Sequence, residues 1–338
     1  MRRKLSEISS FESILCMFVV MIHILSDSIN KYPMGSVLSA VSFIFSRTIT
    51  FAVPAFIISS GIKFAHGYAD GSFRYFSFLK RRITKVYLPY LLMALIYYLY
   101  FVFHRHYFDF NPWIMLRHLS LGTIAAPFYF IIVIMQLYII APLTYHFCRN
   151  ISPVVGIIVA AAITIGSKCF LLGFKYADRV FLGYFVYWII GCYIGINFDM
   201  NIDKLKRSKS VWVIWGILFT IIYSAIAYFE FLGWFEWFGT EIIKIIFASF
   251  ASIMWLLIMP KYSHEVSDIL SPATFYIYLI HCLVIFETER YLEIWQISSV
   301  PLRFLILCGT AYIISLAVSI LYSRIKMIFN RNNDIYGI

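Results

Sequence analysis

Long apolar stretches recur along this chain from residue 11 to residue 323, and they limit what it can fold into. Hydrophobic residues make up 62% of the sequence and charged residues only 13%, whereas a soluble domain carries roughly 25% charged residues. Inside lipid only helices and closed barrels satisfy the backbone, and these stretches are continuous rather than alternating. The sequence therefore predicts an all-α polytopic membrane protein, forming one transmembrane domain over residues 1–338, and excludes a soluble α-protein.

About ten stretches are long enough to cross a bilayer, which takes about 20 apolar residues. Lysine and arginine set the orientation, because they gather in cytoplasmic connections. With a cytoplasmic N-terminus, most of the 28 lysines and arginines lie on the inner side. We therefore expect a multi-pass membrane protein with both termini in the cytoplasm. The expected spans are residues 11–29, 41–65, 86–103, 124–147, 153–173, 180–197, 211–229, 241–259, 269–288 and 302–323.

The formal net charge of +11 follows from this topology and from contact with anionic membrane lipids. It does not indicate nucleic-acid binding, because the predicted fold has no soluble basic surface. The basic residues 2–4 precede an apolar run as in a signal peptide, but no small-residue cleavage site follows, so we expect a retained first helix. None of the six cysteines forms a C-x-x-C motif, so the sequence predicts neither a disulfide framework nor a metal site.

His23 lies in the middle of the first predicted span. An ionisable side chain at that depth is costly and marks a functional site by default, and histidine transfers protons near neutral pH. The alternative is a histidine that only hydrogen-bonds a neighbouring helix. Asp27 follows four residues later on the same helix face. Its carboxylate could orient the imidazole, as in a catalytic triad, or simply cap the outer end of the helix in water.

Four cations meet at the inner end of the third predicted span, namely Lys80, Arg81, Arg82 and Lys85. Such a cluster can hold the phosphates of a cytosolic donor. The alternative is the ordinary excess of positive charge on the cytoplasmic side, in contact with anionic lipid. Topology does not explain Pro89, just inside the span, which indicates a shaped helix start.

Further polar residues lie within later spans. His281 is at the middle of the ninth predicted span, three residues after Tyr278, and the argument made for His23 applies to it equally. Its alternative is again a histidine used only for helix packing. Gln136, in the fourth span, is expected to form a hydrogen bond between helices.

Taken together, these motifs resemble the acyltransferase-3 family of integral membrane acyltransferases over nearly the whole chain. Residues 129–136 and 187–195 are most similar to a branch of that family associated with poly-N-acetylglucosamine modification and export. The motifs of the wider family are His23 in the first helix, residues 51–61 (Phe-Ala-Val-Pro-Ala-Phe-Ile-Ile-Ser-Ser-Gly), Arg81-Arg82-x-x-Lys85 with Pro89-Tyr90, and Ser271-x-x-Thr-Phe-Tyr-Ile-Tyr-Leu-Ile-His281.

The resemblance implies a ten-helix protein of the bacterial cytoplasmic membrane that transfers an acyl group, commonly acetyl, to a hydroxyl of a cell-surface carbohydrate or exopolysaccharide. The donor would be a cytosolic acyl-CoA, used as a co-substrate, with no tightly bound cofactor. The acceptor would be a surface glycan or lipid-linked sugar, and polysaccharide synthases are possible partners. His23 takes the place of the family's catalytic histidine, and Arg81 and Arg82 that of its basic pair.

One position departs from the family pattern. The family usually has an arginine eleven residues before the histidine, where this chain has Glu12. A carboxylate cannot hold a phosphate or a carbonyl oxygen as arginine does. Another cation could substitute, Glu12 could pair with a lysine or arginine, or the chain could be a polysaccharide exporter or flippase component that transfers no acyl group.

Overall fold

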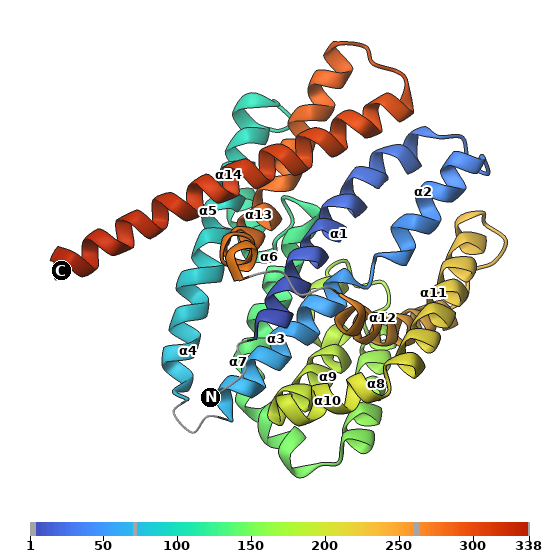
Figure 1. The fold of residues 1–338 in the computed structure, drawn as a ribbon. Coiled ribbons are helices and arrows are strands. Elements are labelled where there is room, and N and C mark those ends of the chain that lie inside the picture. The colour runs from blue at the N-terminus through green and yellow to red at the C-terminus, as the bar shows by residue number, and fades with distance from the viewer. Residues whose placement is uncertain (1–4, 70–72, 260–263, 337–338) are drawn as a thin grey trace. The chain divides into compact units, whose positions relative to one another are not determined.

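The computed structural model describes residues 5–69, 73–259 and 264–336, and their side chains except those of residues 6, 264–272 and 323–336. Within those ranges all regular secondary structure is helical (Figure 1), so the predicted all-α class is confirmed. The chain divides into two compact units. Unit 1 comprises Met1–Ala52, Ile217–Thr240 and Ile258–Ile338, and unit 2 comprises Val53–Gly216 and Glu241–Leu257.

Unit 1 is built around three long helices that pack on one another, α1, α13 and α14 (Figure 1). A shorter helix, α2, folds back along α1 after a turn, and the Ser36 hydroxyl caps its start by accepting from the Ser39 amide at 3.2 Å. The bounds are Ser6–Lys31 for α1, Val37–Thr48 for α2, His264–Ile294 for α13 and Val300–Tyr336 for α14.

Hydrogen bonds between side chains or backbone groups join the three long helices of unit 1. The Tyr312 hydroxyl of α14 donates to the Met17 carbonyl of α1 at 2.8 Å. On the next helix pair, Thr288 of α13 donates to Thr310 of α14 at 3.0 Å. Such contacts stabilise helix packing in lipid, because the hydrophobic effect does not drive helices together in an apolar solvent.

Unit 2 contains the remaining helices, except that α11 belongs to unit 1 from Ile217 onward and α12 belongs to unit 2 only between Glu241 and Leu257. The α-helices are α3 (Ala52–Tyr68), α4 (Tyr75–Arg82), α5 (Leu88–Leu99), α6 (Pro112–Leu121), α7 (Tyr129–Asn150), α8 (Pro153–Phe170), α9 (Phe185–Ile196), α10 (Phe198–Arg207), α11 (Lys209–Phe231) and α12 (Gly239–Ile258). The shorter elements are the π-helices η1 (Ile83–Tyr87) and η2 (Tyr100–His104) and the 3-10 helices η3 (Ala126–Phe128), η4 (Ala177–Arg179) and η5 (Phe181–Tyr184).

Helices α3 and α9 cross with their backbones in contact, because glycines meet at the crossing. A Cβ atom on Gly191 would lie 2.3 Å from the Ile58 carbonyl oxygen, and one on Gly61 would lie 2.7 Å from the Trp188 carbonyl oxygen. Small residues allow this approach between membrane helices. The crossing therefore explains why Gly61 and Gly191 occur in the sequence stretches 51–61 and 187–195.

Eight helices of the described residues are long and apolar enough to cross a membrane, or nine if a bent pair counts as one span. The bent pair is Phe181–Ile196 with Phe198–Arg207, which turns by 104°. This count covers only the described residues and does not include α13, so it is consistent with the prediction of about ten spans. The predicted span 269–288 lies on α13 and begins among side chains outside the described residues. The cytoplasmic placement of both termini stays a prediction.

We expect Gly191→Ala to lower the free energy of unfolding by about 1–3 kcal/mol, the usual effect of overpacking. The added methyl group would collide with the Ile58 carbonyl. Gly166→Ala on α8 is the matched control, because no atom lies within 4 Å of its Cβ position and alanine favours helix. Unfolding titrations in mixed detergent micelles measure both variants. Equal stability of the two would contradict the close crossing.

Candidate functional site

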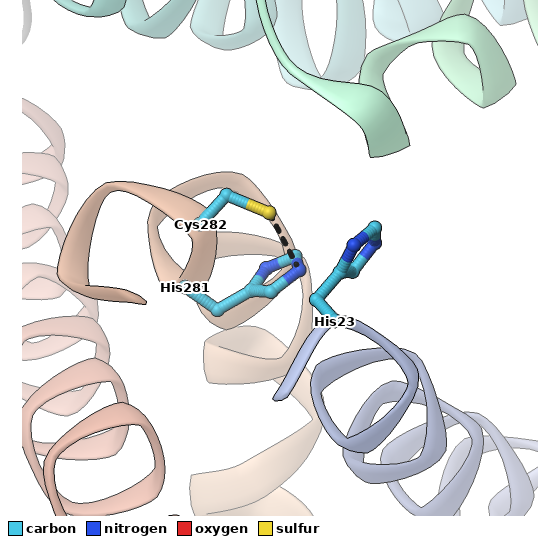
Figure 2. A group of neighbouring side chains, drawn as sticks. All are labelled: His23, His281 and Cys282. Atoms are coloured by element: carbon cyan, nitrogen blue, oxygen red, sulfur yellow. Dashed lines mark hydrogen bonds between the residues drawn. The ribbon is translucent and has the colours of Figure 1, made fainter. Parts of the chain in front are cut away.

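The candidate site in unit 1 begins with His23 on α1. Its side chain is half-buried, and its ring lies against that of His281 on α13, with 5.2 Å between the ring centroids. Within the described ranges, His23 makes no hydrogen bond. Figure 2 shows the two rings next to one another, carried by separate helices. Two histidines that lie far apart in the sequence, each in the middle of an apolar stretch, therefore belong to one cluster.

His281 is held in a defined orientation. Its Nδ1 lies 3.1 Å from the Ile277 carbonyl oxygen, one turn earlier on α13, and its side chain is fully buried. A carbonyl can only accept, so Nδ1 must carry the proton. The neutral ring then has a free lone pair on Nε2. The Cys282 thiol lies 3.4 Å from that nitrogen and donates to it (Figure 2).

These three side chains bring their donor atoms together in a small volume. The nitrogen or sulfur atoms of His23, His281 and Cys282 lie within 4.8 Å of one another. Tyr278, the other residue predicted on α13, is buried beside them, with its ring 6.1 Å from that of His281. Sequence reasoning selected His23, His281 and Tyr278 separately but missed Cys282. The only available signal was its place next to His281.

Contacts nearer the N-terminal end of α1 fix its position along α13. The hydroxyls of Ser13 and Thr274 are hydrogen-bonded at 3.1 Å, and the Cys16 thiol donates to the Thr274 carbonyl at 3.3 Å. From Ser13 to His23 and from Thr274 to His281 the helices rise by about 15 and 10 Å. These contacts therefore determine which turn of α1 faces the side chains of His281 and Cys282 on α13.

Asp27 has cations as partners, not His23. Its carboxylate oxygens accept from Arg303 Nε and Nη2 of α14 at 3.4 and 3.3 Å, and Lys31 forms a further ion pair with it. Within the described residues no hydrogen bond joins Asp27 to His23. Asp27 and Arg303 are both buried, so the interpretation of Asp27 as a cap in water is wrong. Arg303, which also donates to the Ile297 carbonyl at 3.2 Å, was not predicted.

Glu12 lies on α1 eleven residues before His23, which corresponds to about 16 Å along the helix axis. It is half-buried and has partners within the structure. At that distance along one straight helix, Glu12 does not contact the histidine pair.

The basic cluster lies in unit 2, on α4 and the π-helix η1. Lys80, Arg81 and Lys85 are exposed. Arg82 is half-buried, and its guanidinium lies over the rings of Phe78 and Tyr138, 5.0 and 4.9 Å from their centroids. Cation–π contact on two sides restricts this side chain. The cluster thus combines one guanidinium held between two rings with three exposed cations.

The π-helix within the basic cluster has a local cause. Pro89 has no N–H to donate to the carbonyl of Lys85, so the regular α-helical pattern is interrupted at this turn. The chain passes through η1 and resumes as α5, with Pro89 in the first turn. Pro89 therefore marks a π-turn inside one continuous helical segment, Tyr75–His104, and not the helix start that the sequence predicted. Such π-bulges occur frequently at functional sites.

Gln136 lies in unit 2 and has a structural environment. Its side-chain nitrogen donates to the Arg179 carbonyl at 2.8 Å, and its oxygen accepts from the Phe181 amide at 3.1 Å. Both groups of the amide are therefore used to hold the segment between α8 and α9. The prediction that Gln136 would hydrogen-bond another spanning helix is wrong in detail. Its partners are backbone groups of the short elements η4 and η5.

Comparison with known proteins agrees with this fold and these motifs. The acyltransferase-3 family, described as an acyltransferase domain, matches residues 7–320. The chain belongs to this family. Its apolar helices and the membership together make it a multi-pass membrane protein.

Curated relatives of this acyltransferase-3 member come from Staphylococcus aureus. The proteins of strains MSSA476 and MW2 are each named a probable poly-beta-1,6-N-acetyl-D-glucosamine export protein and are 22% identical over 310 residues. The alignment covers 86% of this chain and 85% of theirs. The protein of strain MRSA252, with the same name, is 21% identical over 311 residues. No solved structure matches this chain significantly.

We expect Asp27→Leu to lower the free energy of unfolding by about 3–5 kcal/mol, because it leaves the buried Arg303 without its carboxylate partner. Arg303→Leu should also lower it, but by less, because Lys31 still pairs with Asp27. The double variant should lose clearly less than the sum of the two. Lys31→Ala is the control, with an expected effect of about 1 kcal/mol or less for an exposed partner. Unfolding titrations in mixed micelles provide this double-mutant cycle. Additive losses would show that the two side chains are not coupled.

Proposed function

We propose that this protein is a membrane O-acyltransferase that moves an acyl group, commonly acetyl, from a cytosolic acyl-CoA to a hydroxyl of a cell-surface carbohydrate. The observation that carries the proposal is the half-buried His23, free of hydrogen bonds within the described residues and facing a second histidine, in a chain of the acyltransferase-3 family. A basic imidazole in an apolar site suits proton transfer from a hydroxyl.

In the proposed reaction, His23 acts as general base on the acceptor hydroxyl. The hydroxyl oxygen attacks the thioester carbonyl, a C–O bond forms and the C–S bond breaks. The proton taken by His23 passes to the departing CoA thiolate, which leaves as the free thiol. Acyl-CoA is a co-substrate in this scheme, and no tightly bound cofactor takes part. The ion pair of Asp27 with Arg303 positions α1 and therefore His23.

Donor binding is assigned to the basic cluster Lys80, Arg81, Arg82 and Lys85. CoA carries several phosphates, and cations bind these through charge-assisted hydrogen bonds. Arg82 is already restrained by two rings, which lowers the entropy lost when it binds. An exporter of a neutral sugar polymer has no need of such a cluster, which favours transfer over export.

The acceptor is proposed to be a surface glycan or a lipid-linked sugar. The Staphylococcus aureus relatives are named for a poly-N-acetylglucosamine polymer, which carries free hydroxyl groups. The same name favours the second candidate function, in which the protein is a component of polysaccharide export and acts beside a polysaccharide synthase. The two functions differ in whether CoA is released during the reaction.

We expect His23→Ala to reduce acyl-CoA turnover by about 10²–10⁴-fold, the range for loss of a general base. Release of free CoA by purified protein, with a crude surface-glycan fraction as acceptor, provides the measurement. His146→Ala is the matched control, because that histidine is exposed on α7 in unit 2. Size-exclusion profiles must show equal folded amounts. A His23→Ala variant as active as wild type would contradict the role given to His23.

We expect Lys80→Ala, Arg81→Ala and Lys85→Ala each to raise KM for acyl-CoA. A lost charge-assisted contact is worth about 1.5 kcal/mol, or about tenfold in KM. Lys204→Ala, which removes an exposed cation from α10, is the control. A short thioester without phosphates should be used equally well by all variants. If the KM of that short donor rose in parallel, the cluster would not be binding phosphates.

A further inference from the structure

The cluster of His23, His281 and Cys282 has the composition of a soft metal site. It offers two imidazole nitrogens and one sulfur, whose donor atoms lie within 4.8 Å of one another, and none of these three side chains is a carboxylate. Imidazole and thiolate ligands suit zinc and copper, whereas magnesium and calcium prefer carboxylates, carbonyls and water. Catalytic zinc sites also use three protein ligands, with a fourth position open.

The distance between two of the three donor atoms, Nε2 of His281 and Sγ of Cys282, already matches that of a tetrahedral zinc site. In a tetrahedral zinc site with Zn–N of about 2.05 Å and Zn–S of about 2.3 Å, the nitrogen and sulfur lie about 3.5 Å apart. Nε2 of His281 and Sγ of Cys282 lie 3.4 Å apart. His23 is half-buried and makes no hydrogen bond to any described residue. No such bond has to break when its ring turns to become the third ligand.

The surroundings of His281 point independently to a ligand. A histidine that binds metal almost always donates its other ring N–H to a carbonyl, carboxylate or water, which fixes the tautomer. Nδ1 of His281 donates in this way to the Ile277 carbonyl at 3.1 Å and leaves the Nε2 lone pair directed at the cluster. The burial of His281 and Cys282 keeps water away from two of the ligands.

We propose that His23, His281 and Cys282 form a binding site for one Zn²⁺ ion, with the fourth position on the half-buried side of His23. The Cys282 thiol loses its proton on binding, because thiolate is the form that ligates zinc. The consequence for activity rests on the function proposed above. A zinc-bound His23 has no lone pair for the acceptor hydroxyl, so the loaded protein is inhibited, and free zinc regulates the enzyme.

The test measures the metal directly, apart from turnover. Purified protein in detergent is titrated with Co²⁺, whose thiolate charge-transfer absorption and strong visible bands report a four-coordinate site with sulfur. Competition with Zn²⁺ then gives the zinc affinity. We expect one ion per chain for wild type, and at least a tenfold loss of affinity, with loss of the sulfur band, in Cys282→Ser. Cys16→Ser is the control. Cys16 is a buried thiol on α1 that donates to the Thr274 carbonyl and lies outside the proposed site.

His281→Gln provides a second variant, and circular dichroism shows whether each variant is folded. Unchanged cobalt spectra and affinities in folded Cys282→Ser and His281→Gln, or no binding by wild type, would overturn the site. Turnover is measured separately with and without added zinc. Zinc inhibition that weakens in Cys282→Ser supports the regulatory consequence, and a requirement for zinc contradicts it. Absent turnover would count against the acyltransferase function and leave the binding result standing.

Discussion

The structure depends on the fact that lipid offers no hydrogen-bond partners, so polar groups inside the membrane must find them within the protein. The buried pair of Asp27 and Arg303 is the strongest case in unit 1, because it joins α1 to α14 through two charged groups. The hydroxyl contacts of Ser13 with Thr274 and of Tyr312 with the Met17 carbonyl act in the same way along α1. Together they fix the position of α1 against its neighbours.

Within the described part of the chain, His23 is one of the polar side chains that depart from that rule, as several buried serine hydroxyls also do. Among the described residues its imidazole makes no hydrogen bond, and it lies against the ring of His281. An unsatisfied polar group in an apolar interior lowers stability, and such features occur where function requires them. The histidine pair therefore fits a site that meets a substrate or an ion better than one that only holds two helices together.

The helical class, most spans and the place of His23 and His281 within apolar helices could be predicted from the sequence, because lipid imposes long apolar runs and makes buried ionisable groups rare. Contact between His23 and His281 could not be predicted, since it depends on the register of α1 against α13. The partners of Asp27 were missed for a similar reason. Arg303 follows 276 positions later, and sequence spacing favoured the nearer His23. In the sequence Cys282 is indistinguishable from a packing residue, because its contact with Nε2 of His281 depends on the side-chain orientation of that histidine.

The measurement that tests the account most directly uses the protein reconstituted in liposomes, with acyl-CoA labelled in its acyl group and a lipid-linked sugar as acceptor. Acyl transfer predicts that label becomes esterified to the sugar and is released again by mild alkali, with one free CoA formed for each ester. Movement of the sugar across the bilayer with no label on it and no CoA released would contradict acyl transfer and establish export.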